Sequence, residues 1–264
     1  MSTTYLNSEL AANMVALRTI VYREIRRFTR IWPQTLLPPA ITMVLYFVIF
    51  GNLIGRQIGD MGGFTYMEYI VPGLIMLSLF TESLNNASFG IYLPRFTGTI
   101  YEVLSAPVSA LEIVLAYVGA AATKSLIIGA VILATSFFFV DVTIKHPVAM
   151  VAFLILTCIS FSLLGFIIGI WAGNFEQLQI IPALIITPLV FLGGSFYSTS
   201  MLPPFWQAVT LLNPVHYLIS GFRWAFFEQA DVPVTISLAA IAVFTGLCLA
   251  FIAWIFQSGW RIRQ

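Results

Sequence analysis

The sequence predicts an all-α integral membrane protein with six transmembrane helices. Hydrophobic residues fill 59% of the 264 positions and charged residues only 9%, which is too few charges to cover a water-soluble surface. Six apolar runs are each long enough for a bilayer core, which takes roughly 20 helical residues. Arginines gather at both chain ends, so we expect both termini on the cytoplasmic side and an even number of spans.

The first 31 residues are expected to form an amphipathic helix in the cytoplasmic interface of the membrane. Arginines dominate one helical face, and the other face carries Leu10, Met14, Leu17, Val21, Ile25 and Phe28. A plain basic anchor that only sets the orientation of the first span is the alternative. A cleavable signal peptide is not expected, because the segment lacks a short apolar core followed by small residues.

The six spans are expected at residues 33–54, 69–93, 113–140, 147–171, 178–197 and 234–256, within a single domain that covers residues 1–264. Gly165, Gly169 and Gly173 lie at four-residue spacing around the fourth span, which favours close approach of helix backbones. Cys158 and Cys248 fall inside apolar runs, so we expect them to be packing residues.

Residues 201–227, between the fifth and sixth spans, are apolar but are interrupted by Pro203, Pro204 and Pro214. A seventh span is one interpretation, but it would place the two basic chain ends on opposite sides. We therefore expect an external re-entrant helical hairpin that turns at Asn213-Pro214, where proline removes a backbone donor and disfavours helix just before it. Irregular backbone at membrane depth must be covered by protein or by a water-filled cavity.

Residues 95–109, between the second and third spans, form a short amphipathic pattern on the cytoplasmic side. Arg95, Thr99 and Glu102 are polar, Pro107 ends the helix, and the expected apolar face consists of Phe96, Ile100, Val103 and Leu104.

Two ionisable residues, Glu82 and Lys124, lie near the middle of predicted spans. Each would cost on the order of 3 kcal/mol there without a partner. We expect both to face the protein interior, where Ser78, Glu82, Asn85 and Asn86 form a polar stripe with a possible role in the substrate path. A structural ion pair, or a lysine that reaches to the interface, is an equally weighted alternative.

Catalytic motifs are incomplete. The stretch 119–125, GAAATKS, has Thr123 where a phosphate loop requires glycine. Ser195 and His216 suggest an intramembrane serine protease, but Phe196 interrupts the Gly-x-Ser-Gly pattern. The only two histidines, His146 and His216, have no carboxylate cluster beside them, so no metal site is expected. The basic residues are few and lie mostly at the chain ends, so nucleic acid is not an expected partner either.

Together these features resemble the permeases of bacterial type-2 ABC exporters, a family that includes antibiotic-resistance and nodulation-factor exporters. The basic helix before the first span is similar, and so is the loop with Arg95, Glu102 and Leu104 followed by Pro107, Val108 and Ser109. The most specific match runs from Pro188 to Arg223 through Gly194, Leu202, Pro203, Asn213, Pro214 and Tyr217. Gly193 departs from the pattern, since many members have serine there.

The resemblance implies a half-transporter in the bacterial cytoplasmic (inner) membrane that pairs with itself, or with a close relative, and with two separate ATPase subunits. It implies no cofactor in this chain, with ATP and Mg²⁺ held by the ATPases. Residues 95–109 would be the coupling helix, seated in the ATPase by Phe96, Ile100, Val103 and Leu104, while Arg95 and Glu102 set the polar register.

The transported cargo is less defined. Tyr197, Phe205 and Trp206 lie near the predicted outer face, which suits a lipophilic or amphipathic cargo such as a lipid, glycolipid or drug, but suits an aromatic membrane belt equally. Polysaccharide also remains open. A secondary transporter or channel without an ATPase is the alternative function, and an intramembrane enzyme is a second alternative.

Overall fold

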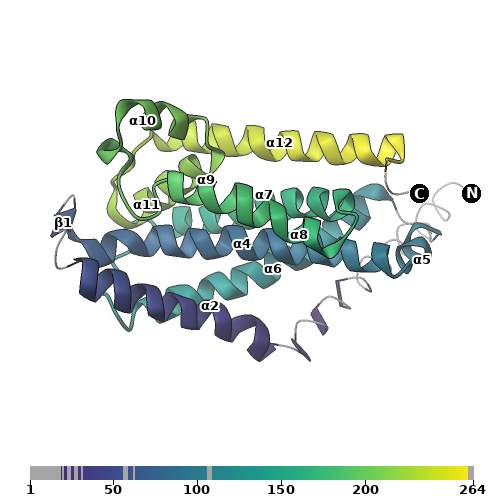
Figure 1. Cartoon of the computed structure of the whole chain (residues 1–264), viewed down its shortest axis with the longest axis horizontal. Helices are drawn as coiled ribbons and strands as arrows, with labels where there is room; N and C mark the ends of the chain where they lie inside the picture. Colours follow the sequence, from purple (N-terminus) through teal and green to yellow (C-terminus); the bar gives the residue numbers. More distant parts are fainter. Residues whose placement is uncertain are drawn as a thin grey trace, which may run out of the picture.

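The computed structural model describes residues 19, 21, 22, 25, 26, 29, 30, 32–55, 59–61, 63–105 and 109–260, apart from the side chains of residues 52–54, 103 and 104. Within these residues, six helical segments are long and apolar enough to cross a membrane, which confirms the predicted all-α multi-pass architecture. They run side by side along the long axis of the molecule (Figure 1).

The spans correspond to the six predicted apolar runs. The first is α2 (Trp32–Tyr46), which continues as the π-helical segment η1 (Phe47–Ile54). The next three are the single helices α4 (Tyr66–Phe96), α6 (Ala110–Ser136) and α7 (Pro147–Trp171). The fifth is divided into α8 (Phe175–Ile181), the π-helical η2 (Pro182–Ile186) and α9 (Thr187–Leu192), and the sixth is α12 (Val234–Ser258).

Two capping boxes explain why α4 and α6 begin three residues before their predicted apolar runs. Thr65 accepts a hydrogen bond from the Glu68 backbone N–H while the Glu68 carboxylate accepts from the Thr65 backbone, and Ser109 and Glu112 repeat this arrangement before α6. The caps satisfy backbone donors that hydrophobicity alone does not register. Prolines explain the division of the fifth span, because Pro182 begins η2 and lacks a backbone N–H.

Helix α4 lies at the centre of the molecule. About two thirds of its most apolar window (67%) is buried inside the chain, compared with 11% for the first span and 22% for the fifth and sixth spans. Its closest neighbour is α7. A Cβ added at Gly165 would lie 2.3 Å from the Leu84 carbonyl oxygen, and one at Gly169 would lie 2.4 Å from the Ser88 carbonyl oxygen. The glycines therefore allow backbone contact between α4 and α7, as expected for small residues at this spacing.

Short elements distinguish the two ends of the bundle (Figure 1). One end holds the antiparallel pair β1 (Asp60–Met61) and β2 (Phe64–Thr65), the 3-10 turn η3 (Thr199–Met201), and the helical hairpin of α10 (Pro204–Leu211) and α11 (Pro214–Phe227). The opposite end holds α5 (Ile100–Ser105) and the C-terminal end of α12. The hairpin expected at 201–227 and the short helix expected within 95–109 thus lie at opposite ends.

The expected N-terminal helix falls only partly within the described residues. The described residues between Thr19 and Arg30 are helical. Val21 packs against a buried cluster that includes Ile113 and Ile252, whereas Ile25 is exposed. Leu10, Met14, Leu17 and Phe28 lie outside the described residues.

Candidate functional site

A cavity of about 330 Å³ lies between the first, second and fifth spans, at the level of Glu82. Its lining combines one carboxylate, several hydroxyl groups and two aromatic rings: Pro38, Pro39, Thr42, Tyr46, Leu77, Ser78, Thr81, Glu82, Thr187 and Phe191. Tyr46 and Phe191 also belong to an aromatic group, since each ring contacts Phe196. The lining thus combines apolar surface with a few polar groups, as sites for small molecules do.

Glu82 is connected to Lys124 through Asn86. The Lys124 Nζ donates a hydrogen bond to the Asn86 Oδ1, and the Asn86 Nδ2 lies 3.4 Å from the Ser125 Oγ. Asn86 also hydrogen-bonds the Glu82 side chain, and Glu82 and Lys124 attract each other electrostatically. The two ionisable groups therefore share one polar network between α4 and α6, which offsets the cost of placing them at this depth.

The predicted polar stripe thus divides into two parts. Ser78 and Glu82 line the cavity, whereas Asn86 turns to Lys124 and Ser125 on α6. Asn85 is partly buried on α4 and is not among the residues that line the cavity. The sequence did not indicate Thr42, Tyr46, Thr187 or Phe191, because a cavity between three spans has no pattern within any one of them.

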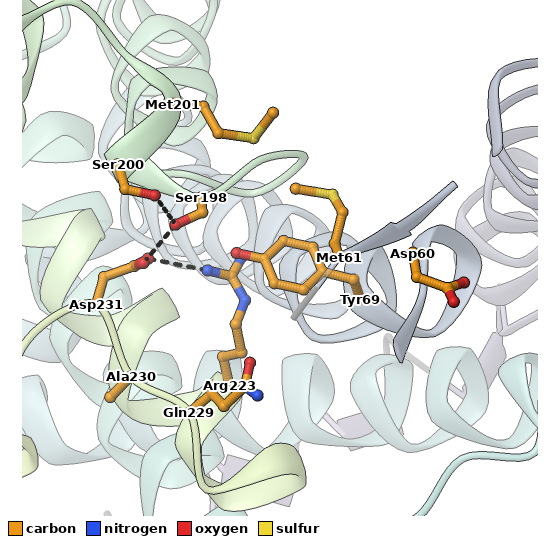
Figure 2. Close-up of a pocket in the computed structure, with 10 residues that line it drawn as sticks. All are labelled: Asp60, Met61, Tyr69, Ser198, Ser200, Met201, Arg223, Gln229, Ala230 and Asp231. Atoms are coloured by element: carbon orange, nitrogen blue, oxygen red, sulfur yellow. Dashed lines mark hydrogen bonds and ion pairs between the residues drawn. The ribbon is translucent and has the colours of Figure 1, made fainter. Parts of the chain in front are cut away.

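At the end that carries the hairpin, Arg223 forms a buried network (Figure 2). It is 1% exposed, its Nη1 lies 3.0 Å from the Asp231 Oδ2, and its Nη2 donates to the Gly194 carbonyl. The guanidinium carbon stands 4.2 Å from the centre of the Tyr69 ring, a cation–π contact. Arg223 thereby joins α11 to the start of α4, the end of the fifth span and the loop before α12.

A pocket of about 430 Å³ opens beside this network. It is lined by Asp60, Met61, Tyr69, Ser198, Ser200, Met201, Arg223, Gln229, Ala230 and Asp231. Ser198 donates to the Asp231 Oδ1 at 2.9 Å and lies at the same distance from the Ser200 hydroxyl (Figure 2). The sequence pattern indicated Arg223 but not Asp231 or Tyr69. The Asp231 carboxylate, eight residues after Arg223, was the available signal for a charge partner.

The hairpin is fixed at the predicted Asn213-Pro214 turn. Asn213 caps α11 by accepting from the Val215 N–H at 3.0 Å, and its Nδ2 donates to the Leu189 carbonyl of the fifth span. The Tyr217 hydroxyl donates to the Leu211 carbonyl at 2.7 Å, which closes the hairpin on itself. Pro203 precedes α10 directly. Helix α10 is mostly exposed and α11 mostly buried, so the hairpin rests on the other spans through α11.

At the opposite end, the residues of the expected coupling helix lie in different settings. Phe96 belongs to the last turn of α4 and is 62% exposed, whereas Ile100 begins α5 and is 5% exposed. Tyr101 and Glu102 are exposed on α5. Val103 and Leu104 are helical, with side chains outside the described set, and Pro107 lies outside the described residues. Ile100 therefore packs within this chain. Tyr101 is an exposed aromatic residue that was not part of the predicted apolar face.

Arg95 also points into the chain. Its Nη1 lies 2.9 Å from the Ala172 carbonyl oxygen and 3.4 Å from the Gly169 carbonyl oxygen, and it donates to the Ile170 carbonyl. These are carbonyls at the C-terminal end of α7, where backbone acceptors lack partners within their own helix. A positive charge there is also favoured by the helix dipole.

The residues considered for catalysis have structural contacts instead. The Ser195 Oγ donates to the Val190 carbonyl at 2.8 Å, and the His216 Nδ1 lies 3.2 Å from the Gly193 carbonyl oxygen. Among the described residues, no group of three or more histidine, cysteine, aspartate or glutamate side chains could hold a metal ion.

Six spans, a proline-broken hairpin at one end and a short helix after the second span at the other define a multi-pass α-helical membrane protein. Residues 15–227 match the model of the ABC-2 type transporter family, and the chain belongs to that family.

Close relatives support the same assignment. The chain is 45% identical over 251 residues to the inner membrane transport permease YadH of Escherichia coli K12, a match that covers 95% of this chain and 98% of YadH. It is 23% identical over 228 residues to nodulation protein J of Neorhizobium galegae, covering 84% of this chain and 85% of the relative. The protein is a multi-pass inner-membrane transport permease.

Proposed function

We propose that this chain is the permease subunit of an ATP-driven ABC exporter, and that separate ATPase subunits dock on its α5 end. The observation that carries the proposal is the short helix α5, which begins three residues after the second span ends. It presents the exposed Tyr101 and Glu102, and the last residue of the second span, Phe96, is exposed as well. A small apolar surface with one carboxylate suits a protein partner, because buried aromatic contacts dominate interface energetics.

The described part of the docking surface consists of Phe96, Tyr101 and Glu102. The sequence pattern adds Val103 and Leu104, whose side chains lie outside the described set. Ile100 supports this surface from within the permease, because it packs against the cluster that contains Ile113 and Val114. ATP and Mg²⁺ belong to the ATPase partner in this proposal, since the only stretch similar to a phosphate loop lies inside α6, where Lys124 is bonded to Asn86.

The cargo path runs beside the cavity that contains Ser78 and Glu82. Its aromatic and hydroxyl-bearing lining favours an amphipathic or lipophilic cargo. The working unit is a homodimer with two ATPases, and both chain termini lie on the cytoplasmic side. The low burial of the first, fifth and sixth spans within one chain supports the proposal, because it leaves helix surface for a second copy.

A matched pair of variants tests the docking surface. Leu104→Asp introduces a charge into α5, and Leu212→Asp introduces the same charge at the opposite end, where Leu212 is 85% exposed. We expect both variants to insert in the membrane, Leu104→Asp to lose co-purification of the ATPase, and Leu212→Asp to retain it. Normal ATPase recovery with Leu104→Asp would rule out this placement.

A further inference from the structure

We propose that Arg95 is a positioning residue that joins the cytoplasmic ends of α4 and α7. With Phe175 of α8 packed against the same end of α4, displacement of α5 then moves the second, fourth and fifth spans together. The inference rests on the proposed function, because an ATPase docked on α5 supplies the displacement. It differs from the sequence-based expectation, in which Arg95 faces the ATPase.

The first step is the short connection between α5 and α4. Helix α4 continues to Phe96, and only residues 97–99 separate it from α5. Gly98 has φ +79°, a left-handed conformation that ends the helix and is strained for other residues. The Thr97 N–H donates to the Leu93 carbonyl at 2.9 Å, and the Tyr101 N–H donates to the Gly98 carbonyl at 3.2 Å. A displacement of α5 therefore reaches the end of α4 through a tight, hydrogen-bonded link.

The second step is the bond from Arg95 to α7. Its Nη1 is within hydrogen-bonding reach of the carbonyls of Gly169, Ile170 and Ala172, which lie in and just after the last turn of α7. Hydrogen bonds from a charged donor are stronger than those from a neutral one. The site is partly buried, so water competes with them less than at a fully exposed helix end.

The third step is the close packing of α4 and α7 next to this bond. Gly169 contacts Ser88, which precedes Arg95 by seven residues, or about 10 Å along a helix. Gly165 contacts Leu84 one turn further along. The two helices are thus held by backbone contact within the span and by Arg95 at its end, which resists both separation and rotation.

The fourth step brings in the fifth span. The Phe175 ring, at the start of α8, lies 4.9 Å from the Tyr92 ring and 5.3 Å from the Phe96 ring, measured between centroids. Later residues of the same span, Thr187 and Phe191, line the cavity that also contains Glu82 of α4. We call these contacts of Arg95 and Phe175, where the ends of α4, α7 and α8 meet, the Arg95 joint. The joint links α5 to two walls of the cavity.

The experiment uses the permease with its co-purified ATPase in lipid nanodiscs. A single reporter cysteine, Thr187→Cys, is placed in the fifth-span wall of the cavity that contains Glu82, after Cys158 and Cys248 are changed to alanine. The rate of its reaction with a hydrophilic maleimide is measured without nucleotide and after trapping with ATP and vanadate. Arg95→Gln removes the charge, Arg95→Lys retains it, and Arg30→Gln is the matched loss of an exposed arginine near the same end.

We expect trapping to change the labelling rate about fivefold in the parent protein and in Arg30→Gln, the scale of a typical coupling between distant sites. Arg95→Gln should retain the ATPase but lose this change. Arg95→Lys should restore part of it, since a lysine supplies the charge without the planar guanidinium. If Arg95 only stabilises the fold, both Arg95 variants should give less purified protein. Their ATPase binding and their labelling response should then fall together.

Two outcomes would overturn the inference. Loss of the ATPase in Arg95→Gln would make Arg95 a docking residue. If trapping changes the labelling rate of Arg95→Gln as much as that of the parent protein, the coupling does not depend on Arg95. An unchanged labelling rate in the parent complex on trapping would contradict the proposed ATP coupling itself, which distinguishes failure of the proposed function from failure of the joint.

Discussion

Two arginines hold opposite ends of this permease in different ways. Arg223 is fully enclosed and bonded to the Asp231 carboxylate, the Gly194 carbonyl and the Tyr69 ring. Arg95 is partly buried and donates to the last carbonyls of a neighbouring helix. A buried ion pair fixes its elements because separation leaves an uncompensated charge, whereas a bond to helix-end carbonyls can be exchanged for water at modest cost. The difference predicts that the hairpin end loses more stability than the α5 end when its arginine is replaced.

The largest expected effect is at the hairpin end. Arg223→Gln leaves the Asp231 carboxylate, whose side chain is only 14% exposed, without its cation. We expect a loss of about 3 kcal/mol in stability. Arg95→Gln, the matched variant at the other end, should cost roughly 1 kcal/mol. Thermal unfolding of the purified proteins in detergent measures both, and equal losses would contradict the comparison.

The next effect concerns the packing beneath the Arg95 joint. Gly169→Ala places a Cβ 2.4 Å from the Ser88 carbonyl oxygen, so α4 and α7 must separate, at a cost of about 1–3 kcal/mol. Gly119→Ala is the control, because a Cβ there meets nothing within 4 Å, and helix propensity alone should stabilise it by about 0.5–1 kcal/mol. If the Tm values of both variants shift in the same direction, the contact at Gly169 does not determine how closely α4 and α7 pack.

A smaller effect is expected inside the bundle, between the two ends. Glu82→Gln and Lys124→Met each break the network through Asn86, and the double variant should lose less than the sum of the single losses. We expect a coupling energy of at least about 0.5 kcal/mol in a double-mutant cycle of unfolding. Strict additivity would show that the two groups do not act as a pair. If the folded double variant transports normally, Glu82 and Lys124 have no role in the substrate path.

The smallest effect is at the surface of the hairpin end. The Lys145 Nζ lies 3.0 Å from the Glu228 Oε2, and this hydrogen bond and charge, together with His146, hold the pKa of Glu228 below its usual value of 4.5. A lowered carboxylate pKa stabilises the folded state above the unfolded value and ceases to do so as pH falls through the folded-state value.

We therefore expect the parent protein to show a small decrease in Tm below about pH 4.5 that Lys145→Met reduces. Thermal scans of the two proteins in matched buffers measure this difference. The same acid sensitivity in both would show that the Lys145–Glu228 pair does not contribute to it.

The sequence predicted the parts of the fold that depend on local patterns. Hydrophobicity and proline chemistry predict six spans, the helix break at Asn213-Pro214 and the short helix before Pro107. All three have counterparts in the described structure. Helix α5 coincides with the core of the predicted 95–109 segment.

Contacts between distant segments could not be predicted in the same way. Arg95 has the polar character expected of a docking residue, but the acceptors of its bonds lie more than 70 positions later in the chain. Ile100 has the same apolar character as Phe96, although only Phe96 is exposed. Composition and periodicity identify a face of a helix, and only the packing of neighbouring helices shows what covers it.

The central claim is that the ATPase docks at the α5 end. Tyr101→Cys and Leu212→Cys, each made without the native cysteines, replace exposed residues at opposite ends and can carry a photoactivated cross-linker. Irradiation of the membrane-embedded complex followed by mass spectrometry identifies the protein that each position reaches. The account predicts an adduct with the ATPase from position 101 and none from position 212, whereas an ATPase adduct from position 212, or none from position 101, would contradict it.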